Sequence, residues 1–372
     1  MTSALLIPVI LACMFLLEHW IFRKFWSRGL RVKLEFGARP VSEGEMTTLT
    51  ETVTNRNFLP LPVVTISFQT NNGLAFPGEK NMTVSDHTNM WDIFSIRFYE
   101  KITRTLPLLC LKRGYYRINR TSVTAQDALT AETEYINFEQ DTHLYVFPSR
   151  LEEEKMAVPL EKILGEVQAR RHLFEDVFMF RGIRGYERTD PMNTINWKAT
   201  ARTGDLKVNL HDSTAGQSVR ILLNLEDPAI CYHKTLLEDC IRIAAAIATR
   251  LIGQSLPVSI ITNGRDTVTS RALELPAGAS PDHEKSILEL LARIDLAQPR
   301  DNFMEVLDRE IVHAAETDLT YVLISSNSYG EFPDRVEAFG RVCGRLLWLC
   351  PVTKDMADPY VGPHVEYLRL RH

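Results

Sequence analysis

The densest group of side chains able to do chemistry lies between residues 181 and 207. Its cations alternate with acids and aromatic rings: Arg181, Arg184, Arg188, Lys198, Arg202 and Lys207 are interleaved with Glu187, Asp190, Asp205, Tyr186 and Trp197. Arginine presents a planar fork of donors that fits carboxylate or phosphate, and an aromatic ring can stack on a guanidinium group. The pattern predicts either a site for an acidic partner or an internal network of ion pairs. Because acids nearly match bases, we favour the internal network.

A second group, Asp227, Cys231 and His233, follows the apolar run that begins at Val219. A histidine within reach of a nucleophile suits general acid–base work, so a hydrolase is one hypothesis. The phosphate-binding loop GxxxxGK[ST], the HExxH and GxSxG motifs and a GxGxxG after a strand are all absent from the sequence. We therefore predict a non-enzymatic protein without a cofactor, with the hydrolase as the alternative.

Composition narrows the function classes further. The 42 Lys and Arg residues against 47 Asp and Glu give a formal net charge of -5, too close to neutral for a general nucleic-acid binder. Nucleic acid is therefore not an expected partner, although residues 181–207 leave it open as a third hypothesis. The six cysteines include no CxxC pair, which argues against structural zinc. Most of them lie among apolar neighbours, as buried free thiols do in a reducing compartment.

The N-terminal segment is the strongest hydrophobic signal in the chain. Residues 4–17 are unbroken apolar, and Arg23 and Lys24 follow them. This pattern predicts an anchor helix over residues 1–28 that crosses the inner membrane once, with Trp20 and Trp26 at its interfaces. By the positive-inside rule the N-terminus lies outside and the bulk is cytoplasmic, with the lipid bilayer as a partner. A buried core helix or an interfacial anchor is the alternative.

Three further segments are expected to position these groups. Residues 29–148 contain alternating and β-branched runs between turn residues, which predicts an immunoglobulin-like antiparallel β-sandwich. Residues 149–216 follow neither period for long and are expected to connect. Residues 217–372 alternate strands with amphipathic helices, which predicts an open, mainly parallel α/β sheet. The fold class is thus a multidomain α and β protein with a membrane helix, a sandwich and an α/β sheet.

Residues 184–191 (RGYERTDP) and 195–208 (INWKATARTGDLKV) resemble the hallmark of the bacterial domain-of-unknown-function-58 family, roughly RxYxxGDxxRxIDWKATARxGxLxV. RGYY at 113–116, DAL at 127–129 and LYVFP at 144–148 are similar to other motifs of that family. Thr189 stands for the usual Gly and Asn196 for the usual Asp, and the Arg expected among 192–194 is missing. The positions carried over as a partner-binding or structural motif are Arg184, Tyr186, Asp190, Trp197, Lys198, Arg202 and Gly204.

The resemblance implies a von Willebrand factor A-like C-terminal domain that works beside a MoxR-type AAA+ ATPase. When such domains bind metal, they place a DxSxS motif after the first strand. Asn224, Glu226 and Pro228 occupy those positions, a degenerate set that leaves Mg²⁺ too few oxygen ligands, so we predict no metal. The strand-end loops 226–233 and 325–329 are the expected contact surface for a protein partner. The function expected is that of a membrane-anchored adaptor.

Overall fold

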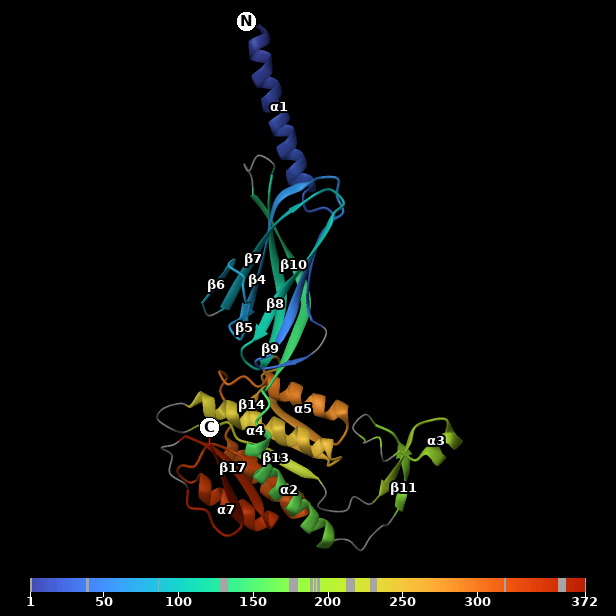
Figure 1. Ribbon diagram of the computed structural model, residues 1–372, viewed down its shortest axis with the longest axis vertical. Helices are drawn as coiled ribbons and strands as arrows, with labels where there is room; N and C mark the ends of the chain where they lie inside the picture. Colours follow the sequence, from blue (N-terminus) through green and yellow to red (C-terminus); the bar gives the residue numbers. More distant parts are fainter. Residues whose placement is uncertain are drawn as a thin grey trace. The chain divides into compact units, whose positions relative to one another are not determined.

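The computed structural model describes residues 2–37, 40–85, 87–127, 133–173, 180–187, 190, 192, 195–211, 218–227, 233–317, 319–353 and 359–371. The chain forms two compact units, Met1–Phe147 and Pro148–His372 (Figure 1). Each unit has hydrophobic core clusters of its own. The first unit contains both the N-terminal helix and the β-strands that follow it, and the second contains residues 149–216 together with the α/β sheet.

The predicted membrane-spanning helix is wrong. Helix α1 (Thr2–Phe25) carries Glu18, Arg23 and Lys24 within its own turns, and no helix among the described residues is long and apolar enough to cross a membrane. Its last turn instead belongs to the first unit, because Phe22 and Trp26 are 2% and 4% exposed in that unit's core. Trp26 therefore lies among protein side chains, not at a lipid interface. The single-pass orientation predicted from this helix is therefore not shown, and the lipid bilayer as a partner stays a prediction.

Two β-sheets make up the rest of the first unit. One has the order β1-β3-β8-β5 and the other β2-β10-β9-β4-β7-β6, and neighbouring strands are antiparallel except for β2 and β10. The strands are β1 (Leu30–Phe36), β2 (Val41–Ser42), β3 (Met46–Asn55), β4 (Leu61–Asn71), β5 (Leu74–Ala75), β6 (Met82–Val84), β7 (His87–Ile96), β8 (Lys101–Cys110), β9 (Gly114–Gln126) and β10 (Thr133–Phe147).

Alternation along these strands directs one face of each sheet into a shared core. In β1 every second residue is buried, and Leu34 and Leu49 from one sheet cluster with Phe68 and Ile118 from the other. A second cluster contains Val53, Ile66 and Val123 together with the end of α1. The opposite faces of both sheets carry mostly polar side chains, with Ile93 and Tyr135 among the exposed apolar exceptions.

The second unit is built on a six-stranded sheet of order β15-β14-β13-β16-β17-β18, in which all neighbours are parallel except β14 and β15. The strands are β13 (Val219–Leu223), β14 (Val258–Arg265), β15 (Ala272–Gly278), β16 (Thr320–Ile324), β17 (Leu346–Val352) and β18 (Val365–Arg371). β13, β16 and β17 are buried at every residue, as expected of strands covered on both faces. Edge strands β15 and β18 lacked a distinct sequence signal and were not predicted.

Helices cover both faces of this sheet, which makes three layers (Figure 1). They are α2 (Glu153–Leu173), α4 (Lys234–Gly253), α5 (Pro281–Arg293), α6 (Phe303–Glu316) and α7 (Phe332–Cys343). Residues of α2, α4 and α5 share one core cluster, whereas residues of α6 and α7 share the other.

The predicted fold class is corrected at its N-terminal part. The protein is β-rich, with 41% strand and 31% helix, and none of its described helices could span a membrane.

Part of the segment expected to be an irregular connection is regular. β11 (Phe180–Gly185) and β12 (Lys207–His211) form an antiparallel pair, with Arg184 opposite Val208. Between them lies α3 (Trp197–Thr203), a helix of seven residues. We call residues 180–211 the motif lobe. Its elements are too short for either hydrophobic period to persist, and for this reason the sequence pattern did not reveal them.

Candidate functional site

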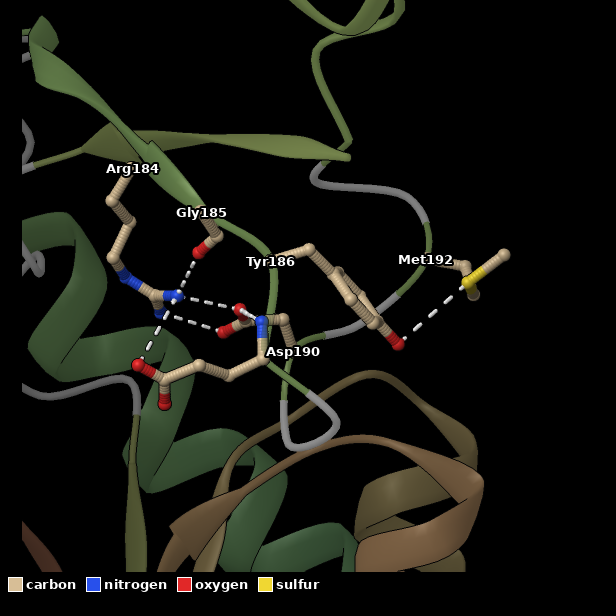
Figure 2. Close-up of polar contacts among 6 residues, drawn as sticks. Arg184, Gly185, Tyr186, Asp190 and Met192 are labelled. Carbon is tan, nitrogen blue, oxygen red and sulfur yellow. Dashed lines mark hydrogen bonds and ion pairs between the residues drawn. The ribbon is translucent and has the colours of Figure 1, made fainter. Parts of the chain in front are cut away.

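The motif lobe brings Arg184 and Asp190 together in a bidentate ion pair. Nη1 and Nη2 of Arg184 each lie 2.7 Å from one carboxylate oxygen of Asp190, and Nη1 also donates to the carbonyl of Gly185 at 2.9 Å (Figure 2). Burial alone would raise the pKa of Asp190, but the hydrogen bonds from Arg184 and from the Glu187 N–H outweigh it and lower the pKa. These two residues are therefore engaged with each other, as an internal network requires.

Tyr186 lies beside this pair and fastens the strand end to the opposite side of the lobe. Its backbone N–H donates to the carbonyl of Leu206 at 3.0 Å, and its hydroxyl lies 3.9 Å from the sulfur of Met192 (Figure 2). The ring is half-exposed and does not stack on a guanidinium group in the described residues. Arg181 has no described side chain, and Arg188 lies outside the described residues.

The start and end of α3 explain two positions of the family-like motif. Asn196 is the N-cap, and its side chain accepts a hydrogen bond from the Ala199 N–H at 2.8 Å. Asn and Asp serve equally well at this position, so the substitution in the motif keeps its structural role. Gly204 ends the helix with φ 80°, a left-handed conformation that favours glycine.

The outer side of α3 is exposed and basic. Trp197 is 64% exposed, Lys198 and Arg202 are exposed, and neither cation forms an ion pair with another described residue. Three further large apolar side chains of the lobe are exposed, namely Ile183, Met192 and Leu206 at 45%, 59% and 43%. The lobe buries only Ile195 and Val208 among its described side chains. Exposed apolar side chains and exposed cations thus both occur on the described part of this lobe.

Asn224, the first of the degenerate metal positions, lies at the carboxyl end of the second unit's sheet in a network of neutral side chains. The amide of Asn224 donates to the hydroxyl of Ser325 at 3.0 Å and accepts from the Asn263 amide at 3.3 Å. Asn263 also accepts from the Leu225 N–H at 2.9 Å. All three side chains are buried, so β13, β14 and β16 are tied together at their ends. Asn263 was not predicted as part of this network, because residue spacing gives no local signal for it.

Acids near this network are used as helix caps. A carboxylate oxygen of Glu226 accepts from the Phe303 N–H at 2.9 Å, at the start of α6, and burial raises the pKa of Glu226. Asp227 accepts from the His233 N–H at 2.6 Å, before α4, and lies 3.5 Å from the His233 ring nitrogen Nδ1. Pro228 and Cys231 lie outside the described residues. The position of Cys231, the nucleophile of the hydrolase hypothesis, is therefore not described.

The other expected contact loop is mostly internal. Ser325, Ser326 and Asn327 are buried, and the Trp348 indole donates to the Ser325 carbonyl at 3.1 Å. Tyr329 is 47% exposed at the end of this loop. Within the described part of the chain, no group of three or more His, Cys, Asp or Glu side chains is arranged to hold a metal ion.

No protein-family model matches the sequence, and no curated protein matches it either. Similar solved structures include the full-length major pilin SpaD from Corynebacterium diphtheriae, at 11% identity and a TM-score of 0.23, with 31% of this chain and 34% of the pilin covered. A cohesin module from a Clostridium perfringens family 33 glycoside hydrolase matches at 7% identity and a TM-score of 0.20, with 30% of this chain and 97% of the module covered. A non-cellulosomal cohesin from Archaeoglobus fulgidus matches at 9% identity and a TM-score of 0.21, with 33% of this chain and 95% of the cohesin covered. The chain spans about a third of the full-length pilin's length.

Proposed function

We propose that the chain is a non-enzymatic interaction protein that binds a protein partner through the outer side of its motif lobe. The observation that carries this proposal is Trp197, 64% exposed on α3 beside Lys198 and Arg202, two cations that form no ion pair with any described residue. Tryptophan and arginine are enriched at the energetic centres of protein interfaces. An aromatic side chain kept in water by a capped helix is a feature that partner binding would explain.

The chemistry of this surface defines the partner. The exposed apolar side chains of the lobe, Ile183, Met192 and Leu206, suit an aliphatic or aromatic anchor of the partner. Lys198 and Arg202 suit carboxylates of the same partner. Arg184 is already engaged by Asp190, so we assign it a structural role that holds the lobe in shape. The partner is thus an acidic segment with an apolar side chain at its centre.

The family resemblance of residues 184–208 gives this partner a candidate identity. We propose that the chain belongs with the domain-of-unknown-function-58 proteins and that the acidic segment is part of a MoxR-type AAA+ ATPase. The von Willebrand factor A-like assignment of residues 217–372 is part of the same proposal. The three-layer arrangement of helices around a mainly parallel sheet supports it.

The test is co-purification of the tagged full-length protein with its source organism's MoxR-type ATPase, with and without ATP, followed by affinity measurement on the pair. Trp197→Ala should weaken binding roughly thirtyfold, the change that about 2 kcal/mol produces at an interface centre. Lys198→Glu with Arg202→Glu should also weaken it, and more at low salt than at high salt.

The matched control is Tyr360→Ala, which removes an aromatic ring that is 90% exposed outside the lobe. This variant should bind as the unaltered protein does. Binding that is insensitive to Trp197→Ala, or equally reduced by Tyr360→Ala, would show that the lobe is not the docking surface. Absence of the ATPase under both nucleotide conditions would remove that partner from the proposal.

A further inference from the structure

A groove of about 500 Å³ crosses the outer face of the larger sheet of the first unit. We call it the sheet groove. It lies over β4, β7 and β9, and its lining is Ser67, Phe68, Gln69, Thr70, Asn71, His87, Asn89, Met90, Trp91, Arg117, Asn119, Arg120 and Ser122. Its volume is in the range of small-ligand sites in proteins. Every lining residue belongs to the first unit, so the groove is formed by that unit alone.

The groove arises because β4 and β9 separate. The two strands pair from Val63 opposite Gln126 to Phe68 opposite Thr121, and there the pairing ends although both strands continue. β4 remains paired with β7 as far as Asn71, and β9 remains paired with β10. The pairing of β9 with β10 is irregular next to Arg120, where β9 exposes two successive residues. β4 therefore stays paired with β7 and β9 with β10, while β4 and β9 are no longer paired with each other, and the sheet opens between them.

The lining is polar and carries positive charge. Four side-chain amides, Gln69, Asn71, Asn89 and Asn119, face it together with the hydroxyls of two serines, and Arg117 and Arg120 supply the cations. None of the lining residues is Asp or Glu. Arg120 has no ion pair with a described residue, whereas Arg117 pairs with the exposed Asp141 at 3.0 Å. At the inner wall, Thr70 is 5% exposed and its hydroxyl has no hydrogen-bond partner among the described residues.

Aromatic rings lie at both sides of these polar groups. Trp91 is half-buried in the lining on β7. On the far side, Tyr115 precedes Arg117 by two residues and therefore shares its face of β9. The Tyr115 ring lies 5.0 Å from Tyr145 and 5.6 Å from His143, both on β10. The face thus combines flat apolar rings with amides and cations.

We propose that the sheet groove binds an acidic oligosaccharide. Sugar hydroxyls both donate and accept hydrogen bonds, as side-chain amides do. One amide can therefore donate to one sugar hydroxyl and accept from its neighbour. The apolar face of a sugar ring packs on aromatic rings such as Trp91, and a carboxylate on the sugar matches the guanidinium of Arg120.

The full-length protein should be titrated by calorimetry with trigalacturonate, an acidic trisaccharide, and with maltotriose, a neutral one. We expect trigalacturonate to bind with a millimolar or lower dissociation constant, at least tenfold tighter than maltotriose, and to weaken as salt rises. Trp91→Ala and Arg120→Gln should each weaken trigalacturonate binding at least fivefold. Because Arg120 is exposed, its replacement leaves the fold intact even if the Trp91 variant unfolds.

The control is Tyr99→Ala, which removes a 70% exposed ring of the same unit that does not line the groove. Its affinity for trigalacturonate should equal that of the unaltered protein. No heat of binding at millimolar trigalacturonate, equal affinity for both trisaccharides, or unchanged binding by Arg120→Gln would each overturn the proposal. The loss of an ATPase partner would leave it unaffected.

Discussion

Asn196 shows how one side chain holds the candidate interaction surface in place. Its side chain accepts from the Ala199 N–H, and its own backbone N–H donates to the Lys207 carbonyl at 2.8 Å, which ties the start of α3 to β12. Trp197 is the next residue, so the direction of its ring depends on this cap. A short helix with no buried side chain has little besides its caps to stabilise it.

Replacement of Asn196 by Ala should therefore loosen α3 without unfolding the rest of the second unit. We expect a loss of about 1 kcal/mol of local stability, seen as faster hydrogen exchange at the Ala199 amide. Asn196→Asp keeps a side-chain acceptor at the cap and should exchange as slowly as the unaltered protein. Equal exchange in the Ala variant would mean that the cap does not control the helix.

Glu51 is a second residue with an unusual environment. It is 0% exposed on the inner face of β3, close to Asp92 of β7 and Arg104 of β8, and Arg104 also pairs with Asp92 and Glu79. Burial, and then the negative charge of Asp92, raise the pKa of Glu51 from 4.5 to about 8, although Arg104 acts in the opposite direction. The folded protein thus holds a proton on Glu51 that the unfolded chain loses above pH 4.5.

This difference has a definite sign. Between pH 4.5 and about 8 the folded state binds more protons, so Glu51 makes the first unit less stable as pH rises. Glu51→Gln should stabilise that unit by on the order of 3 kcal/mol at pH 8 and have little effect at pH 4. Denaturant unfolding at the two pH values checks this. An equal effect at both would show that the carboxyl does not titrate as stated.

At the scale of elements, the carboxyl ends of β13, β14 and β16 are closed by amide and hydroxyl groups. Asn224, Asn263 and Ser325 satisfy one another, and Glu226 is used by the α6 N-terminus. A hard cation needs several convergent oxygens, which these groups already give to other donors.

We accordingly expect no Mg²⁺ or Mn²⁺ binding tighter than about millimolar to the full chain, because too few free oxygens converge at this edge. Calorimetric titration with either metal measures this, with a chelator-treated sample as the control. Stoichiometric binding tighter than that would contradict the account of the strand ends.

At the scale of the whole molecule, the two units have separate cores. Leu49 and Leu106 belong to a cluster drawn only from the first unit, and Leu323 and Trp348 to one drawn only from the second. Because no core cluster is shared, each unit is expected to unfold as a cooperative block of its own.

Calorimetric unfolding of the full chain should thus resolve two transitions. Glu51→Gln should move only one of them, upward at pH 8, and Leu323→Ala should move only the other, downward by the equivalent of about 3 kcal/mol. A single transition that both variants shift together would mean that the units unfold as one.

Local pattern was enough to predict several elements of the six-stranded sheet in the second unit and of the helices that cover it. The apolar run at 219–225 corresponds to β13, and the 3.6-residue spacing of residues 236–251 corresponds to α4. Periodicity records which face of a segment is buried, and this is a local property. The same reasoning misjudged the end of α1, because the local pattern did not show that Phe22 and Trp26 pack into the core of the first unit.

The sites themselves depended on tertiary structure. Asn224 meets Asn263 and Ser325 across 39 and 101 residues, a convergence that follows from strand order and not from spacing. Residue types alone revealed the cluster at 181–207, but only the fold decided that Arg184 is engaged by Asp190 while Trp197, Lys198 and Arg202 face outward. The sheet groove had no sequence signal, because it exists only where β4 and β9 separate. Composition and periodicity determine which residues are buried, whereas function depends on which distant residues share a surface.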